Sequence, residues 1–279
     1  MTRMDFSVVV PFYNAEQFIE RCVRALLEQA YPADRYEILM VDNGSTDSSA
    51  SIVGKFGRVR LLKEPEQGSY AARNRGIREA RGSIVAFTDP DCVPREDWLA
   101  QIGRAMDRPN TSVVLGDRQF AGDCGMLGDL AAYESALCRR IFETGKAEYY
   151  YAYTNNMAVR MTVLKATGGF ERLPRGADTL FLRRVLRECG SSAVTHSPDV
   201  LVRHLEIGSA RDYLRKKGIY GRINRNPELS PSRSLPLTTR CGLALQVVRA
   251  RGGSLADKIA FLGVLVAGAI RFDWERRKD

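Results

Sequence analysis

Two carboxylates one residue apart, Asp89 and Asp91, follow the apolar stretch of residues 84–87. An interior strand that ends there would present hard oxygen ligands at the carboxyl edge of a sheet, where α/β folds bind their ligands. Such ligands suit Mg²⁺ or Mn²⁺, and a metal-bound diphosphate is the expected occupant. Pro90 keeps Asp89 out of the helical region of backbone space and so holds it extended beside its partner. The alternative interpretation is a polar turn that closes a strand.

The segments that must position this pair alternate between strand-like and helix-like patterns over the first 120 residues. Short apolar runs rich in β-branched residues predict strands, and the amphipathic stretches between them predict helices. This alternation is typical of βαβ units, which build a parallel sheet. The predicted strands are residues 6–11, 37–41, 59–62 and 83–88.

Two of the predicted helices begin with informative residues. Asn14 can cap the first helix, with Gln17 at the spacing of a capping box, and Pro32 would end it. The third helix, about residues 69–80, carries Arg73 in its first turns. Cations near a helix N-terminus oppose the helix dipole, so they favour an anionic ligand there. Arginines that only point into solvent are the alternative.

The composition places the chain among globular proteins. It has 279 residues, of which 44% are hydrophobic, and this is enough for a sizeable core. Its six cysteines show neither CxxC pairs nor regular spacing. Residues 6–10 already look like a strand, and no signal-peptide pattern precedes them. These features predict a location in the reducing cytoplasm.

The net charge of +9 comes from the last part of the sequence, because residues 201–279 hold 16 Lys plus Arg against 7 Asp plus Glu. A basic region of this kind predicts an anionic partner such as a lipid surface, a nucleic acid or an acidic acceptor, and a solvated helix face is the alternative. Within this basic region, the prolines and serines of residues 225–237 predict a linker. We therefore expect a main domain at 1–224 and a helical region at 238–279.

Two apolar stretches in that C-terminal region, residues 241–248 and 259–270, are flanked by cations. The second stretch is too short to cross a bilayer, which takes about 20 apolar residues. Short apolar segments flanked by cations suit an anionic lipid surface. We predict a peripheral contact with the inner face of the cytoplasmic membrane; helices packed on the main domain are the alternative.

Four polar motifs follow the predicted strands or open the next helix, and all would meet at one edge of the sheet. They are Pro11-Phe12-Tyr13-Asn14, Val41-Asp42-Asn43-Gly44-Ser45-Thr46-Asp47, Gly68-Ser69-Tyr70-Ala71-Ala72-Arg73-Asn74 and Asp89-Pro90-Asp91. With these motifs in this order, residues 5–205 resemble a family 2 glycosyltransferase of the GT-A fold. The resemblance implies an α/β fold with a Rossmann-like mixed sheet flanked by helices, followed by a C-terminal helical appendage that associates with a membrane.

The resemblance implies a role for each motif. Pro11 and Tyr13 would line a nucleoside pocket, and Asp42 would accept hydrogen bonds from a base such as uracil. A turn carboxylate is the alternative for Asp42. Arg73 would lie near the base or the diphosphate. Asp89 would contact the ribose or a metal-bound water.

The metal and the catalytic base complete the implied site. Asp91 would bind Mn²⁺ or Mg²⁺, and His204, after a strand-like stretch, would complete the metal or diphosphate site. Asp178 would be the catalytic base, although a helix N-cap explains it too. Ala177 stands where family members often have a glutamate. His196 is expected to be a surface or core residue.

The implied reaction is inverting, metal-dependent transfer of one sugar from a nucleotide-sugar donor, with a UDP-sugar favoured. The acceptor would be a hydroxyl of a glycan or lipid-linked molecule in cell-surface polysaccharide or glycolipid synthesis, with no nucleic acid as partner. The QxxRW motif of processive synthases is absent, which predicts one transfer per encounter. A nucleotidyltransferase, or a non-catalytic protein that binds nucleotide sugars or nucleic acid, is the alternative.

Overall fold

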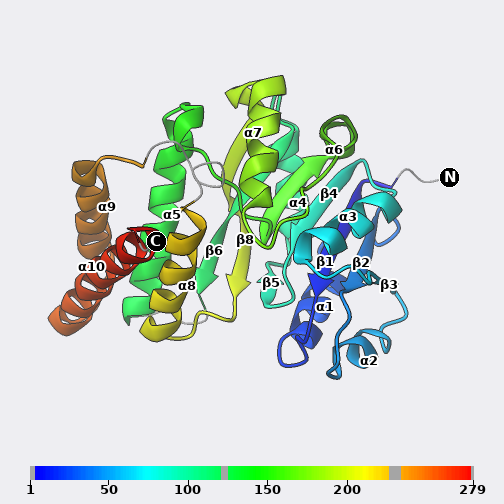
Figure 1. Ribbon diagram of the computed structural model, residues 1–279, viewed down its shortest axis with the longest axis horizontal. Helices are drawn as coiled ribbons and strands as arrows, with labels where there is room; N and C mark the ends of the chain where they lie inside the picture. Colours follow the sequence, from blue (N-terminus) through cyan, green and yellow to red (C-terminus); the bar gives the residue numbers. More distant parts are fainter. Residues whose placement is uncertain (1–3, 121–124, 226–233, 278–279) are drawn as a thin grey trace. The chain divides into compact units, whose positions relative to one another are not determined.

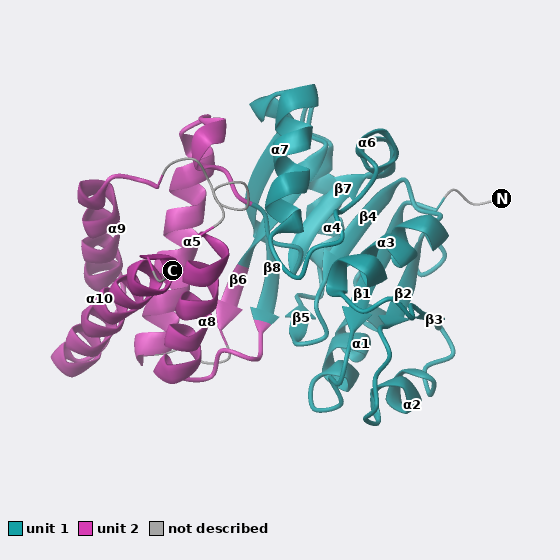
Figure 2. Cartoon of the chain, in the orientation of Figure 1, with its two compact units in different colours: residues 1–117, 152–203 teal, residues 118–151, 204–279 magenta. Residues whose placement is uncertain are grey.

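The structure is a computed structural model of the chain, and it describes residues 4–120, 125–225 and 234–277. The chain divides into two compact units, shown in Figure 2. Unit 1 contains residues 1–117 and 152–203, and unit 2 contains residues 118–151 and 204–279. This division differs from the sequence expectation, because unit 2 includes a segment from the middle of the chain. Residues 226–233 of the predicted linker lie outside the described residues.

A mixed eight-stranded sheet with flanking helices forms the fold, as the sequence predicted (Figure 1). Its order is β3-β2-β1-β4-β7-β6-β8-β5, with parallel pairing from β3 to β4 and with β7 antiparallel to both β4 and β6. The strands are β1 (Phe6–Phe12), β2 (Tyr36–Asp42), β3 (Val59–Lys63), β4 (Ile84–Thr88), β5 (Cys92–Pro94), β6 (Val113–Phe120), β7 (Asn156–Arg160) and β8 (Val194–His204).

The parallel register brings the predicted strand ends to one edge. Phe12 pairs with Asp42, and Asp42 pairs with Lys63, so β1, β2 and β3 end side by side. β4 runs parallel to β1, with Phe87 opposite Val9. The four predicted strands are therefore confirmed, and their polar motifs follow at the same edge.

Helices cover both faces of the sheet in unit 1. They are α1 (Ile19–Leu27), α2 (Ser49–Val53), α3 (Ser69–Glu79), α4 (Trp98–Met106), α6 (Met161–Thr167), α7 (Ala177–Cys189) and the 3₁₀ turn η2 (Ser191–Ala193). Residues Phe6, Val8 and Val10 of β1 pack with α1 and α4 in one core cluster. Because side chains alternate along a strand, Val9 points to the other face, where α3 lies.

Gly76 lets α3 approach β1 closely. A Cβ atom at this position would lie 2.3 Å from Cγ1 of Val9, far closer than two carbon atoms can pack. The missing side chain therefore fixes how α3 lies on the sheet. Because α3 starts at the carboxyl edge, this contact places its first turns beside the ends of β1 and β4.

The predicted cap of the first helix is wrong. α1 begins after Phe18, with no side-chain cap, and it ends at Leu27, before Pro32. Asn14 instead has a positive φ of 48°, and its side-chain oxygen accepts hydrogen bonds from the amides of Thr46 at 2.8 Å and Asp47 at 3.4 Å. Asparagine tolerates this left-handed conformation better than most residues. Its side chain is used across a loop, so it cannot serve the helix.

Unit 2 is helical and has its own core. It contains α5 (Gly125–Glu143), η1 (Ala147–Tyr149), α8 (Ala210–Ile223), α9 (Leu237–Ala250) and α10 (Leu255–Arg277). The buried cluster draws on all four α-helices and includes Leu130, Tyr133, Tyr213, Leu243, Val247 and Phe261. Lys217 and the Tyr213 hydroxyl both reach Glu134, each at 2.6 Å. Among the described helices, none is long and apolar enough to cross a membrane.

Candidate active site

The turn after β4 holds the two carboxylates of the Asp89-Pro90-Asp91 motif. The Asp89 carbonyl accepts a hydrogen bond from the Cys92 amide at 3.0 Å and from the Cys22 thiol at 3.6 Å. The side chain of Asp89 is 30% exposed. The segment is thus a closed turn, as the alternative interpretation expected, and it still presents a carboxylate at the surface.

Arg73 meets an anion within the protein. Its guanidinium donates to the Asp89 carboxylate, and its side chain is only 4% exposed. The same guanidinium lies 5.4 Å from the centre of the Tyr70 ring, and its Nη1 donates to the Ser69 carbonyl at 3.3 Å. Arg73 therefore does not point into solvent, and it is held beside the turn that carries Asp89 and Asp91.

Asp42 ends β2 as a buried carboxylate. Its Oδ1 accepts a hydrogen bond from the Ser45 amide at 2.9 Å, which is the turn contact that the alternative interpretation expected. Within the described part of the chain, its Oδ2 accepts no hydrogen bond from protein. One oxygen thus holds the turn, and the other has acceptor capacity left for a ligand.

Asn43 is a site residue that the sequence analysis missed. Its Nδ2 donates to the carbonyls of Glu64 and Glu66 at 2.9 and 2.7 Å, and its Oδ1 accepts from the Gly68 amide at 2.7 Å. The side chain ties the end of β2 to the loop that leads into α3. Only its position after Asp42 in a turn motif could have pointed to it.

Pro11 and Tyr13 lie at the end of β1. Pro11 is buried within the strand, opposite Val41 of β2. Tyr13 is 54% exposed directly after the strand, so its ring is accessible to a planar ligand.

Asp178 lies in the first turn of α7. Gly176, in the left-handed region with φ of 86°, is the N-cap, so the predicted alternative of Asp178 as N-cap does not hold. Burial raises the pKa of the Asp178 carboxyl, while the Thr179 amide, Arg73 and Tyr70 oppose that rise. A carboxylate with a raised pKa is a better proton acceptor near neutral pH. Ala177 beside it is fully buried and offers no group to a ligand.

Tyr70 connects Asp178 to the carboxylates after β4, and the sequence analysis gave it no role. Its hydroxyl lies near enough to the Asp178 carboxyl to favour the charged form, and its ring lies under Arg73, which pairs with Asp89. Burial, together with the nearby Asp178 charge, raises the pKa of Tyr70, so it remains a neutral donor. Its spacing from Arg73 places both on one face of α3, which was the available signal.

The donor set near Asp91 fits a divalent cation. Asp91, Cys92 and His204 each offer one ligand atom, and these atoms lie within 4.8 Å of one another. His204 is the buried last residue of β8 and directly follows Arg203 in the strand. A carboxylate and an imidazole are ligands that Mn²⁺ accepts. Burial raises the pKa of the Cys92 thiol well above its usual value, so the thiol is a neutral and weak ligand.

Other polar residues that the sequence singled out have structural contacts. His196 lies in the core, as one expectation had it, with its Nε2 2.9 Å from Oδ1 of Asp117. The hydroxyls of Tyr150 and Tyr153 also have structural partners, since they donate to the carbonyls of Phe142 and Gly116.

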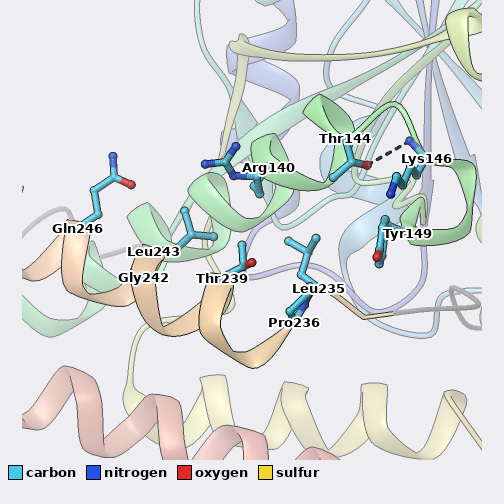
Figure 3. Close-up of a pocket in the computed structure, with 10 residues that line it drawn as sticks. All are labelled: Arg140, Thr144, Lys146, Tyr149, Leu235, Pro236, Thr239, Gly242, Leu243 and Gln246. Carbon is cyan, nitrogen blue, oxygen red and sulfur yellow. Dashed lines mark hydrogen bonds between the residues drawn. The ribbon is translucent and has the colours of Figure 1, made fainter.

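A cavity of about 450 Å³ lies within unit 2, between α5 and α9 (Figure 3). Arg140, Lys146 and Tyr149 line it together with the apolar Leu235 and Leu243. None of the residues predicted to bind the donor or the metal lines this cavity, so it is separate from the candidate site.

Known proteins are similar in sequence to parts of this chain. Residues 7–166 match the family described as "Glycosyl transferase family 2". Glycosyltransferase AglE of Haloferax volcanii is 33% identical over 71% of this chain and 66% of its own length. Glycosyltransferase GlyG of Streptococcus pneumoniae is 35% identical over 40% of this chain and 38% of its own length. The matched regions thus span less than two thirds of either relative.

Solved structures share the fold. Mannosyltransferase PcManGT from Pyrobaculum calidifontis, in complex with GDP-Man and Mn²⁺, has a TM-score of 0.66 at 21% identity, covering 99% of this chain and 89% of its own. S. aureus TarS 1-349 in complex with UDP has a TM-score of 0.60 at 19% identity, covering 96% and 81%. At these identities the likeness establishes the GT-A fold. Together with the match over residues 7–166, it leads to one conclusion: the chain belongs to glycosyl transferase family 2.

Proposed function

We propose that the protein transfers one sugar from a nucleotide-sugar donor to a hydroxyl of a glycan or lipid-linked acceptor, with inversion at the anomeric carbon. The observation that carries this proposal is the proximity of Asp178 to Tyr70 and Arg73, both of which stabilise its charged form, together with the pairing of Arg73 with Asp89. It joins a carboxylate suited to accept a proton with the carboxylates suited to a metal diphosphate. Family membership supports the class of reaction.

The residues at the strand ends would bind the donor. Oδ2 of Asp42 would accept a hydrogen bond from the imide N–H of uracil, which favours a UDP-sugar. Pro11 and Tyr13 would flank the nucleoside. The similar structures contain UDP in TarS and GDP-Man in PcManGT, which supports a nucleoside diphosphate donor.

The diphosphate would meet Arg73 and a divalent cation. Asp91 and His204 would hold Mn²⁺ or Mg²⁺, and Asp89 would contact the ribose or a metal-bound water. When bound, such a cation supplies charge neutralisation for the leaving nucleoside diphosphate. The guanidinium of Arg73 can donate to a phosphate oxygen from its position beside Asp89.

Asp178 would act as the base. Its carboxylate would accept the proton of the acceptor hydroxyl as that oxygen attacks the anomeric carbon. Tyr70 would keep the carboxylate oriented and ionised by donating to it. A single displacement of this kind needs no covalent intermediate on the enzyme.

The acceptor and the location are part of the proposal. The basic C-terminal region, with 16 Lys plus Arg in residues 201–279, supports peripheral contact with an anionic membrane at its cytoplasmic face. A lipid-linked acceptor, or a glycan that grows on one, would be found there.

Nucleotide release tests the proposal. Purified protein is incubated with Mn²⁺ and a panel of UDP-, GDP- and dTDP-sugars, and the free nucleoside diphosphate is measured. We expect slow release from one donor, lost with EDTA and in Asp91→Asn. No release from any donor, with no cation-dependent donor binding in calorimetry, would overturn the proposal.

A further inference from the structure

Five large apolar side chains stand exposed along one side of α10. They are Leu255, Ile259, Leu262, Val266 and Ile270, with exposed fractions of 75%, 61%, 37%, 60% and 64%. At about 100° per residue, they fall within an arc of about 80°. We refer to these five residues as the α10 stripe.

No charged residue interrupts the α10 stripe. The exposed positions beside it, Ala256, Ala260 and Gly263, are small and uncharged. The opposite side of α10 is apolar too, because Phe261 is buried in the unit 2 core with Leu265 packed against that cluster. A helix that is apolar on all sides is normally buried on all sides. Only one side of α10 is covered within the described structure.

An exposed surface of this kind indicates a partner. Soluble proteins rarely leave a contiguous apolar surface on a helix uncovered, and such surfaces mark contacts with proteins or membranes. The choice between these partners depends on what surrounds the stripe.

Positive charge surrounds the α10 stripe. Unit 2 holds 19 Lys plus Arg against 12 Asp plus Glu, so it carries +7 of the chain's +9. Arg249 precedes the helix, Arg276 and Arg277 end it, and all three are exposed. Trp274, four residues after Ile270, is 63% exposed. Cations and a tryptophan at the ends of an apolar helix face match the charge and polarity of an anionic lipid interface.

A second copy of the chain fits less well. A stable protein interface takes about 20–30 residues a side, whereas the stripe is a single narrow row on one helix. Two copies joined through it would also bring two units of charge +7 together, which is unfavourable.

We propose that α10 lies in the plane of an anionic membrane, with the α10 stripe among the acyl chains and the flanking cations at the lipid phosphates. This assigns a surface to the membrane contact proposed above. An interfacial helix of this type enters about 5–10 Å into the boundary between headgroups and chains. It needs no membrane-spanning segment.

Vesicle co-sedimentation of the full chain tests this proposal. Phosphatidylcholine vesicles with and without phosphatidylglycerol are compared, with no donor sugar present, so the result does not depend on catalysis. We expect binding to the anionic vesicles only. In the double variant Ile259→Glu/Val266→Glu, the binding constant should fall at least about tenfold, since two apolar side chains and their burial are lost.

A charge-matched control separates the stripe from net charge. The double variant Thr238→Glu/Gln246→Glu adds the same two charges at exposed polar positions of α9. Circular dichroism and thermal melting confirm that both variants fold. Equal loss of binding in the two variants would overturn the assignment to the stripe.

The oligomeric state tests whether a second copy of the chain, rather than a membrane, covers the α10 stripe. If light scattering finds a dimer that dissociates in Ile259→Glu/Val266→Glu, and the wild-type chain does not bind anionic vesicles, the membrane proposal is wrong. A monomer that binds anionic vesicles through the stripe supports it.

Discussion

The buried environment of Asp178 differs from that of an exposed carboxylate at the start of a helix. Burial raises its pKa, the Thr179 amide donates a hydrogen bond to it, and the nearby Tyr70 hydroxyl opposes the rise in pKa. Asp89 has a different environment, since it is partly exposed and paired with Arg73. Two carboxylates in such different surroundings suit the two proposed roles of proton acceptor and donor-site ligand.

Substitution of the base separates binding from transfer. We expect Asp178→Asn to bind donor as the wild type does and to lose transfer by about 10²–10⁴-fold, the usual contribution of a general base. Calorimetry gives the first quantity, and product formation gives the second. Unchanged transfer would remove Asp178 from its proposed role.

Tyr70 should influence catalysis through the pKa of Asp178. Its hydroxyl lowers that pKa, so Tyr70→Phe should raise it further. The base acts when deprotonated, and activity therefore falls as the pH falls through this pKa. In the variant the fall in kcat/KM should begin at a higher pH than in the wild type.

A matched control for this prediction is Tyr36→Phe. The Tyr36 hydroxyl is also buried, and it donates to the Leu26 carbonyl at 3.0 Å, away from the site. In Tyr36→Phe, kcat/KM should begin to fall at the same acidic pH as in the wild type. A Tyr70→Phe profile that coincides with the wild type would show that the Tyr70 hydroxyl does not tune the base.

At the scale of elements, loops at the ends of the strands are joined by asparagine side chains. Asn14 after β1 accepts hydrogen bonds from the loop after β2, and Asn43 after β2 bonds to the loop after β3. The three parallel strands bring their ends together, and these bonds lock the loops that would carry the donor. The site is thus preorganised by contacts between loops.

Asn43 offers a test of this locking. Asn43→Ala removes three hydrogen bonds and deprives the buried Glu64 carbonyl of this donor, which should cost about 2–3 kcal/mol of unfolding free energy. Asn43→Asp should cost more, because it places a carboxylate oxygen 2.7–2.9 Å from two carbonyl oxygens. Urea unfolding measures the loss of unfolding free energy in each variant. A smaller loss in Asn43→Asp than in Asn43→Ala would contradict this prediction.

At the scale of the whole molecule, the two units differ in composition and in proposed task. Unit 1 holds the sheet edge with the predicted site residues other than His204, while unit 2 is largely helical and carries most of the positive charge. Ligands for the two tasks should therefore stabilise the molecule through different units.

Thermal unfolding can show which of the two units a ligand stabilises. A ligand at 100 times its Kd stabilises the folded state by about 2.7 kcal/mol. UDP with Mn²⁺ should therefore raise the Tm of the transition that involves unit 1, and UDP with EDTA should not. Asp91→Asn should lose this shift, whereas Ile259→Glu/Val266→Glu should keep it. A shift that is independent of the cation would contradict a metal-linked donor site.

The sequence by itself determined the four parallel strands, the edge at which they end and the family. Strand patterns, turn residues and polar motifs depend on neighbours within a few residues, so they can be recognised without coordinates. Asp89 and Asp91 could be placed at the sheet edge because an apolar run ends just before them. The same local reasoning failed at Asn14, where a contact across two loops outweighs the helix-cap preference.

Only the tertiary structure decided which side chains meet. Arg73 pairs with Asp89, and Tyr70 lies near Asp178, because α3 packs on β1 through Gly76 and α7 begins near the same edge. Likewise, the sequence identified an apolar stretch at 259–270, and the fold decided which of its sides is buried. These contacts join residues far apart in the chain, so they follow from strand order and helix packing rather than from local preference.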